Sequence, residues 1–273
     1  RGAAPGEEEN ASMRLAVLSD IHGNPFALDA VLADVAAQGG VDGYWVLGDL
    51  VAFGPDPAAV MERLAALPNA RFVRGNTDRY LVRNEDPPGM RERAAQEPSF
   101  LEILLEFARS IAWTRGYVTA NGHLDRLADL PLEQRRTLPD GTRMLGVHAA
   151  PGTDDGPGIH PGLSDDELAA LLAPADADLV FVGHTHVPVD RTVGGVRVIN
   201  LGSVSNPATA DLRACYVLLD ADESGYQARF RRVHYDREAA IAAVERLAHP
   251  GARHILRYLR GENRSRWADQ AAG

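Results

Sequence analysis

Short apolar runs alternate with segments of helical periodicity along the first half of this chain. Apolar runs that end in polar loops indicate buried strands, and apolar residues at every third or fourth position indicate helices that cover a sheet. The pattern predicts strands at residues 15–18, 44–47 and 71–74, and helices at 25–38 and 57–67. This alternation is typical of α/β layering.

The second half of the chain is richer in predicted strands. Pro139-Asp140-Gly141-Thr142 predicts a hairpin turn, Gly194-Gly195 predicts a second one, and the capping-box pattern Ser164-x-x-Glu167 predicts the start of a helix. The predicted strands are 135–138, 143–147, 179–182, 189–193, 196–199, 215–219 and 227–233, and the last helices are 237–248 and 254–260. This layout suits two sheets stacked face to face between helices.

The alternation stops between residues 84 and about 131, where helical segments occur without strands. An amphipathic stretch at residues 100–113 is the clearest of them. We interpret the segment as a helical cap insertion, which either adds packing over one sheet edge or forms a lid that selects substrate. Trp113 and Tyr117 of this cap could stack on a nucleobase, but packing within the protein is the favoured interpretation.

The two ends of the chain are polar. Residues 1–12 are expected to form a disordered leader, residues 13–260 one domain, and residues 261–273 a polar tail. No run approaches the roughly 18 apolar residues that span a bilayer, so we expect no membrane anchor. The first residues lack the apolar core of a secretory signal, and the single Cys215 cannot form an internal disulfide. These features fit a cytoplasmic protein.

All 28 basic residues are arginine, and they face 38 acidic residues, for a net charge of −10. The absence of lysine excludes the phosphate-binding lysine of a Walker A loop, Schiff-base catalysis on a chain lysine, and kinase-type nucleotide binding through a strand lysine. The acidic balance argues against stable nucleic-acid binding, which needs a basic face. Phosphate chemistry in this chain therefore needs arginine, backbone amides or metal ions.

Five loops that follow predicted strands carry side chains that bind metals. These residues are Asp20 and His22, Asp49, Asn76, His148, and His184 and His186. Loops at the carboxyl ends of strands converge on one edge of an α/β sheet, where ligands bind. A set of carboxylate, amide and imidazole ligands without thiols suits Mn²⁺, Fe, Ni²⁺, Co²⁺ or Zn²⁺. His234, His249 and His254 lie outside this pattern, and we expect them at the surface.

These motifs resemble the signature blocks of the calcineurin-like metallophosphoesterases. The blocks are Asp20-Ile-His22-Gly23-Asn24, Gly48-Asp49, Gly75-Asn76-Thr77-Asp78, Gly146-Val-His148 and Gly183-His184-Thr-His186, in the family's order. The chain is most similar to the small bacterial and archaeal branch, whose members follow the last block with a hairpin and a turn like Asn200-Leu201-Gly202-Ser203. The resemblance implies a four-layer α-β-β-α sandwich of two mixed sheets flanked by helices, in the α/β (α+β) class.

The resemblance also implies a centre of two divalent metal ions, with Mn²⁺ the first expectation. Carried over position by position, Asp20, His22 and His186 would hold one ion. Asn76, His148 and His184 would hold the second, and Asp49 would bridge the two. A water molecule activated by such ions attacks phosphorus in line with the leaving oxygen.

One position departs from the family pattern, because Thr77 stands where many members have a histidine that protonates the leaving group. Asp78 is retained and could orient water or Arg79, and His160 is a candidate replacement acid. Alternatively, the substrate has a good leaving group and needs no acid. Arg74 and Arg79 flank the Gly75-Asn76 loop and, with Asn24, are the predicted substrate contacts.

We therefore predict a metal-dependent hydrolase of phosphate esters or anhydrides, either a phosphodiesterase or a nucleotide phosphatase of the dinucleoside polyphosphate type. The substrate would be a small phosphorylated molecule, and the chain could form a homodimer. Two alternatives stay open. One is a catalytically weak scaffold that retains the fold, and the other is a nucleotide sensor in which metal and nucleotide control the oligomeric state.

Overall fold

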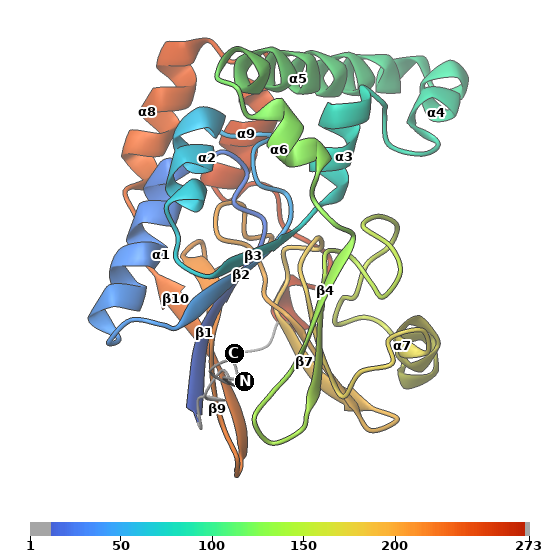
Figure 1. The fold of residues 1–273 in the computed structure, drawn as a ribbon. Helices are drawn as coiled ribbons and strands as arrows, with labels where there is room; N and C mark the ends of the chain where they lie inside the picture. Colours follow the sequence, from blue (N-terminus) through green and yellow to red (C-terminus); the bar gives the residue numbers. More distant parts are fainter. Residues whose placement is uncertain (1–11, 271–273) are drawn as a thin grey trace, which may run out of the picture.

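The computed structural model describes residues 12–270 and contains two five-stranded sheets (Figure 1). One sheet contains β1 Ser12–Leu18, β2 Gly43–Leu47, β3 Ala70–Val73, β9 Ala214–Asp222 and β10 Gly225–Val233, in the order β10-β9-β1-β2-β3. The other contains β4 Glu133–Thr137, β5 Arg143–Val147, β6 Leu179–Val182, β7 Val189–Val193 and β8 Val196–Asn200, in the order β4-β5-β6-β8-β7. Both sheets mix parallel and antiparallel pairs, as the sequence predicts.

Helices cover the outer faces of both sheets. They are α1 Pro25–Ala37, α2 Pro57–Ala65, α3 Asn76–Arg83, α7 Asp165–Leu172, α8 Arg237–Leu247 and α9 Ala252–Leu259. In Figure 1, α1 lies on the first sheet and α7 on the second, and α8 packs against α1 and α9. A buried apolar cluster fills each helix–sheet interface, and a third fills the space between the sheets. The predicted four-layer sandwich is confirmed.

Strand β1 shows how alternating residues build these layers. Leu15 and Val17 belong to the cluster between the sheets, whereas Ala16 and Leu18 belong to the cluster under the helices. This two-residue period follows from strand geometry, in which successive side chains point to opposite faces. β1 pairs in parallel with β2, which pairs in parallel with β3, and β5 pairs in parallel with β6. The loops after these strands therefore meet at one end of the sandwich.

The predicted cap contains α4 Met90–Gln96, a 3₁₀ turn Pro98–Phe100, α5 Leu101–Ala120 and α6 Leu124–Ala128. The long helix α5 packs against α2 and α3 rather than directly on a sheet. Trp113 stacks on Tyr117 with ring centroids 5.1 Å apart, and meets the edge of His249 at 4.3 Å. The two cap aromatics thus contact protein rings.

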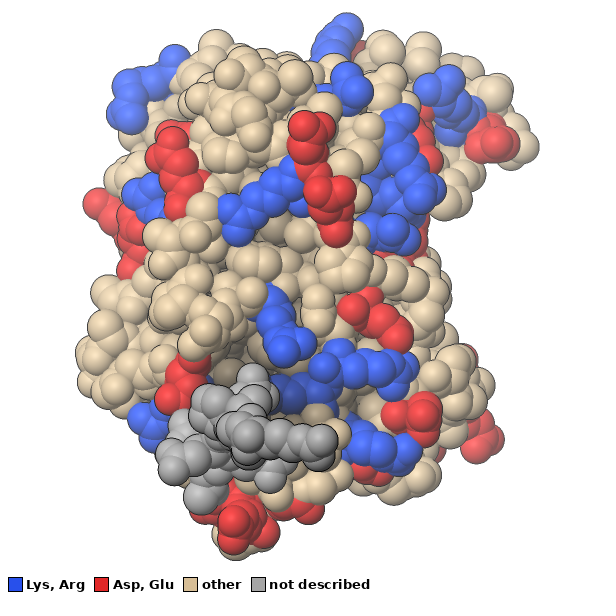
Figure 2. All heavy atoms as spheres, in the orientation of Figure 1, with Lys and Arg blue, Asp and Glu red and all other residues tan. Residues whose placement is uncertain are grey.

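Strand β1 begins at Ser12, one residue before the predicted domain boundary, and the rest of the predicted leader lies outside the described residues. The tail packs on the domain as far as it is described, because Trp267 stacks on His160 with ring centroids 3.5 Å apart. Within residues 12–270, no helix is both long and apolar enough to cross a membrane. On the face drawn in Figure 2, arginines lie beside aspartates and glutamates.

Candidate metal centre

The seven predicted metal ligands come together at the carboxyl ends of five strands. Asp20 and His22 follow β1, Asp49 follows β2, Asn76 begins α3 after β3, His148 follows β5, and His184 and His186 follow β6. The two sheets therefore supply the ligands jointly. Convergence of loops from a rigid platform is the arrangement by which α/β proteins build binding sites.

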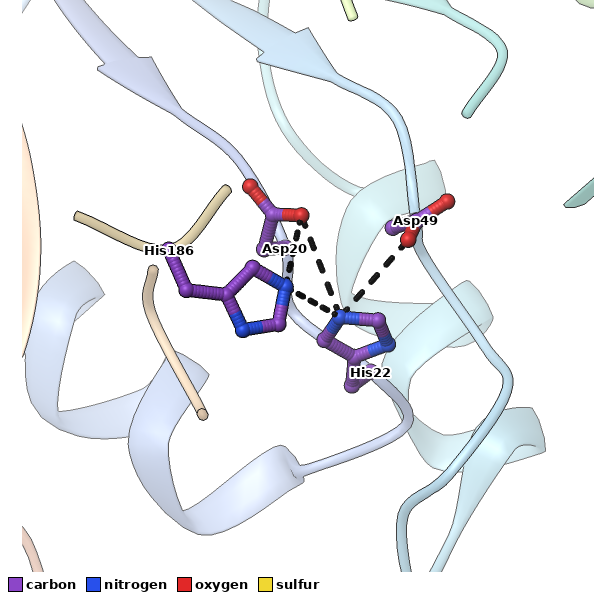
Figure 3. A group of neighbouring side chains, drawn as sticks. All are labelled: Asp20, His22, Asp49 and His186. Carbon is purple, nitrogen blue, oxygen red and sulfur yellow. Dashed lines mark hydrogen bonds and ion pairs between the residues drawn. The ribbon is translucent and has the colours of Figure 1, made fainter. Parts of the chain in front are cut away.

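Four of these side chains form a buried cluster, which Figure 3 shows. One ligand atom from each of Asp20, His22, Asp49 and His186 lies within 4.8 Å of the others. His186 Nε2 is 3.1 Å from Asp20 Oδ1, and His22 Nε2 is 3.7 Å from Asp49 Oδ2. We refer to Asp20, His22 and His186 as the first ligand group.

The first group holds two imidazoles whose Nε2 atoms face one another at 3.1 Å. The Nδ1 atoms contact backbone carbonyls, at 3.0 Å for His22 with Ala52 and 2.6 Å for His186 with Asn206. A carbonyl oxygen only accepts, so each Nδ1 carries the hydrogen and the neutral ring has its lone pair on Nε2. Two lone pairs aimed at each other beside carboxylates fit a cation, which is the geometry expected of metal-binding histidines.

The second ligand group contains Asn76, His148 and His184. Asn76 Oδ1 is 2.9 Å from His184 Nδ1 and 3.1 Å from His148 Nε2. The other ring nitrogens again contact carbonyls, His148 Nδ1 that of Leu47 at 2.6 Å and His184 Nε2 that of Gly156 at 2.8 Å. The ring nitrogen that does not donate to a carbonyl therefore points into the group in both histidines, so this donor set also fits a cation.

Asp49 lies between the two ligand groups. Its Oδ2 is 3.7 Å from His22 Nε2, and its Oδ1 is 3.5 Å from His148 Nε2. Oδ1 also accepts a hydrogen bond of 3.0 Å from the backbone N–H of Thr77. This carboxylate thus lies close to a histidine of each ligand group.

The backbone at the ligands is strained. Of the ten non-glycine residues with positive φ in the described part of the chain, five are predicted ligands: Asp20, His22, Asp49, His184 and His186. The left-handed region costs such residues about 1–3 kcal/mol each and is concentrated at functional sites. The surrounding fold therefore holds these loops in a conformation that aims the side chains inward.

Two motif glycines allow the backbone to approach the carboxylates. A Cβ at Gly75 would overlap Asp49 Oδ1, and a Cβ at Gly183 would overlap the side chains of Ser19 and Asp20. Any larger residue would displace a predicted ligand. The glycines of the Gly-Asn and Gly-His blocks are therefore required by close approach.

Burial dominates the ionisation of the cluster. It raises the pKa of Asp49 to about 7, with a further contribution from the charge of Asp20. Burial, followed by the charge of His186, lowers the pKa of His22 to about 3. For Asp20, burial raises the pKa, but the neighbouring histidines, His186 foremost, outweigh it and lower the pKa. The charge of Asp20 raises the pKa of His186 against the effect of burial. A bound cation would neutralise the carboxylates of this buried cluster.

Asp78 organises the loops around Asp49. It is fully buried, and its carboxylate accepts hydrogen bonds from the backbone N–H groups of Asp49, Leu50 and Gly75, at 2.8, 3.0 and 2.9 Å. Burial and the charge of Asp49 raise its pKa to about 7. These contacts assign Asp78 to holding two ligand loops together rather than to contact with substrate.

The arginines predicted to bind substrate are paired with carboxylates of the loop at residues 153–156. Arg74 Nε donates to Asp154 at 2.6 Å, and Arg79 Nε donates to the same side chain at 3.0 Å. Arg79 also pairs with Asp155 at 2.7 Å and with Glu85. This loop supplies the Gly156 carbonyl to His184. The arginines thus anchor a loop that orients a predicted ligand.

The remaining predicted site residues contact other parts of the fold. Asn24 is fully buried and caps α1, accepting from the N–H of Ala27 and donating to Ser205 Oγ. His160 stacks on Trp267, and burial and the charge of Arg266 lower its pKa, so its imidazole is neutral near pH 7.

Two histidines expected at the surface are not fully exposed. His249 is 3% exposed and lies against Trp113, and His254 is half-buried between Phe53 and Tyr258. Both expectations were wrong because α8 and α9 fold back under the cap, and this packing joins residues distant in sequence. His234 is exposed, as expected.

The carbonyl oxygens that orient the four ligand histidines could not be predicted from the sequence. Any residue can supply a carbonyl, so the sequence carries no signal for them. The ion pairs of Asp154 and Asp155 also lack a local signal, because their partners Arg74 and Arg79 lie 75 to 80 residues away in the sequence.

Comparison with known proteins agrees with this geometry. The sequence matches the calcineurin-like phosphoesterase superfamily domain over residues 13–224, so the chain belongs to this family. An uncharacterized protein of Methanocaldococcus jannaschii is 30% identical over 246 residues, which cover 84% of this chain and 91% of that protein. Phosphodiesterase YfcE of Escherichia coli is 27% identical over 219 residues, covering 77% and 89%.

A solved structure supports the same assignment. The crystal structure of a metallophosphoesterase from Sphaerobacter thermophilus superimposes with a TM-score of 0.70 at 27% identity, covering 92% of this chain and 99% of that one. The fold is therefore that of the metallophosphoesterases, and the buried Asp/His cluster is one that could bind metal.

Proposed function

We propose that this chain is a metal-dependent phosphoesterase that hydrolyses small phosphodiesters or phosphoanhydrides. The observation that supports the proposal is the convergence of the seven predicted ligands, in which His22 Nε2 faces His186 Nε2 while His148 and His184 each turn a ring nitrogen toward Asn76 Oδ1. Asp20, His22 and His186 would hold one divalent ion, and Asn76, His148 and His184 a second, with Asp49 shared. Such ions supply an activated water at neutral pH and neutralise the phosphate charge.

The protein's own groups position this chemistry. Backbone carbonyls fix the tautomers of the four histidines, and Asp78 holds the Asp49 loop against the start of α3. The mixed N and O donor set favours Mn²⁺, with Fe, Ni²⁺, Co²⁺ and Zn²⁺ as further candidates.

The test is hydrolysis of bis-p-nitrophenyl phosphate with added Mn²⁺. Asp49→Ala should lower the rate by at least about 100-fold, because even residues that only support metal ligands contribute 10–100-fold. Asp56→Asn, at the N-cap of α2, should leave the rate unchanged. Equal rates for wild type and Asp49→Ala would instead support a binding scaffold or sensor with the same fold.

Thr77 limits the choice of substrate. Threonine cannot protonate a leaving oxygen near pH 7, and the neutral, stacked His160 offers no proton. We therefore propose substrates whose leaving group departs unprotonated, such as phosphoanhydrides that release a nucleotide and activated aryl diesters that release an acidic phenol. Ethyl p-nitrophenyl phosphate should be cleaved far faster than ethyl phenyl phosphate, and equal rates would show that a proton donor is present.

A further inference from the structure

Five aromatic rings form a closed circuit at the first ligand group. Centroid distances around the circuit are 6.1 Å from His22 to Phe53, 5.2 Å from Phe53 to His254, and 5.3 Å from His254 to Tyr258. They continue at 5.7 Å from Tyr258 to His186 and 5.0 Å from His186 back to His22. Two of the five rings belong to α9, which lies beyond the residues that match the family domain.

The sequence of α9 explains why these two rings face inward. His254 and Tyr258 are four residues apart and therefore share one face of the helix, beside the buried Ile255 and Leu259. Arg257 lies on the exposed face. The helix is thus amphipathic, and its buried face ends at the ligand cluster.

The cap holds α9 in this position. Glu106 of α5 accepts a hydrogen bond of 2.9 Å from the backbone N–H of His254. Phe107 of α5 lies against Phe53, with ring centroids 5.6 Å apart. The cap therefore contacts α9 and Phe53, and these in turn contact the ligand cluster.

Exposure differs between the two ligand groups. Asp20, His22 and His186 are 0%, 3% and 8% exposed. In the second group, His148 is fully buried, whereas Asn76 and His184 are half-buried. Water therefore reaches the cluster at Asn76 and His184 of the second group. The other rings of the circuit lie against His22 and His186 of the first group.

We infer that α9 and Phe53 close the first ligand group from solvent, so that an ion held there exchanges more slowly than an ion held by the second group. This inference rests on the metal binding contained in the proposed function. An ion held by the closed first group leaves only after local opening of the protein, or after the ion of the second group has left. An ion held by the half-exposed second group exchanges directly with solvent. The side chain of Phe53 has no atom that could bind a metal ion, so it can only exclude water from the first ligand group.

Release of Mn²⁺ into excess colour-forming chelator, followed by stopped-flow absorbance, tests the inference. Wild-type protein should release two ions in two phases. Tyr258→Ala should accelerate the slow phase by about tenfold or more, the size of effect typical for groups that surround metal ligands. Tyr258→Phe retains the ring and should retain the slow phase, and Arg257→Ala on the opposite face of α9 should change neither phase.

A single release phase in the wild type would overturn the inference, and so would an unchanged slow phase in Tyr258→Ala. Circular dichroism shows whether Tyr258→Ala folds, and if it does not, His254→Gln serves as the second variant with the same expected acceleration. A different result would contradict the proposed function, namely equal hydrolysis rates for wild type and Asp49→Ala. Release kinetics do not depend on hydrolysis, so the two failures are distinguishable.

Discussion

His22 Nε2 lies 3.1 Å from His186 Nε2, and the Nδ1 of each ring donates to a backbone carbonyl. Both Nε2 atoms thus point at the position where a metal ion would bind. Adding Mn²⁺ should raise the melting temperature, because the ion binds only the folded state, in which the predicted ligands converge. At a free concentration of 100 times Kd, the stabilisation is about 2.7 kcal/mol per ion.

Differential scanning calorimetry with and without Mn²⁺ measures this effect. His22→Ala should reduce the metal-induced shift, whereas His234→Ala, an exposed histidine outside the cluster, should keep it. An equal shift in His22→Ala and wild type would place the ion elsewhere.

Asp78→Asn should weaken metal binding without removing a ligand. An asparagine side chain has one acceptor oxygen and an NH₂ group that cannot accept, so it cannot satisfy the three N–H groups that Asp78 now binds. We expect about 10–100-fold weaker Mn²⁺ binding and a loss of about 1–3 kcal/mol in unfolding free energy. Titration calorimetry and urea unfolding measure the two quantities.

The matched control is Asp56→Asn, because Asp56 accepts one backbone N–H, from Ala59, at the start of α2. Asparagine caps helices as well as aspartate, so this variant should behave as wild type. Unchanged metal affinity in Asp78→Asn would contradict the positioning role.

Arg79→Ala should loosen the loop at residues 153–156. Removing the guanidinium leaves Asp154 and Asp155 without their shared partner, and the Gly156 carbonyl then loses its fixed position at His184. Amide hydrogen exchange in this loop should increase, and Mn²⁺ affinity should fall by about 10-fold or more. Arg63→Ala removes a bidentate surface pair with Asp29 and should change neither measurement. Faster amide hydrogen exchange with unchanged Mn²⁺ affinity would mean that the position of this loop does not influence metal binding.

His249 should make stability depend on pH below neutrality. Burial lowers its pKa from 6.5 to about 4, so between these values the unfolded chain binds a proton that the folded chain does not. This contribution to stability is complete above pH 6.5 and is lost as the pH falls toward 4. The loss is roughly 3 kcal/mol, at 1.36 kcal/mol per pH unit.

Urea unfolding at pH 7.5 and pH 5 measures the change, with chelator present in both. His249→Phe cannot be protonated and should show a smaller loss between the two pH values than wild type. The same loss in both proteins would mean that His249 does not contribute.

The elements near the cluster could be predicted from the sequence because their signals are local. Strand β6 has the predicted bounds, Leu179–Val182, and the capping box at Ser164 begins α7 as expected. The ordered ligand motifs also predicted which loops converge, because parallel strands place their carboxyl ends at one edge. Contacts between distant segments were less predictable, as the burial of His249 under the cap illustrates.

The sequence by itself predicted the strands and helices, and the motifs that resemble the family predicted the layer order and the loops that carry the seven predicted ligands, because strand period and motif spacing are properties of short segments. Only the tertiary structure decided which nitrogen of each histidine faces the cluster, that Arg79 anchors a loop, and that α9 places Tyr258 against His186. These features depend on carbonyls, ion pairs and ring contacts between segments far apart in the chain, and such contacts exist only after the sheets and helices have packed.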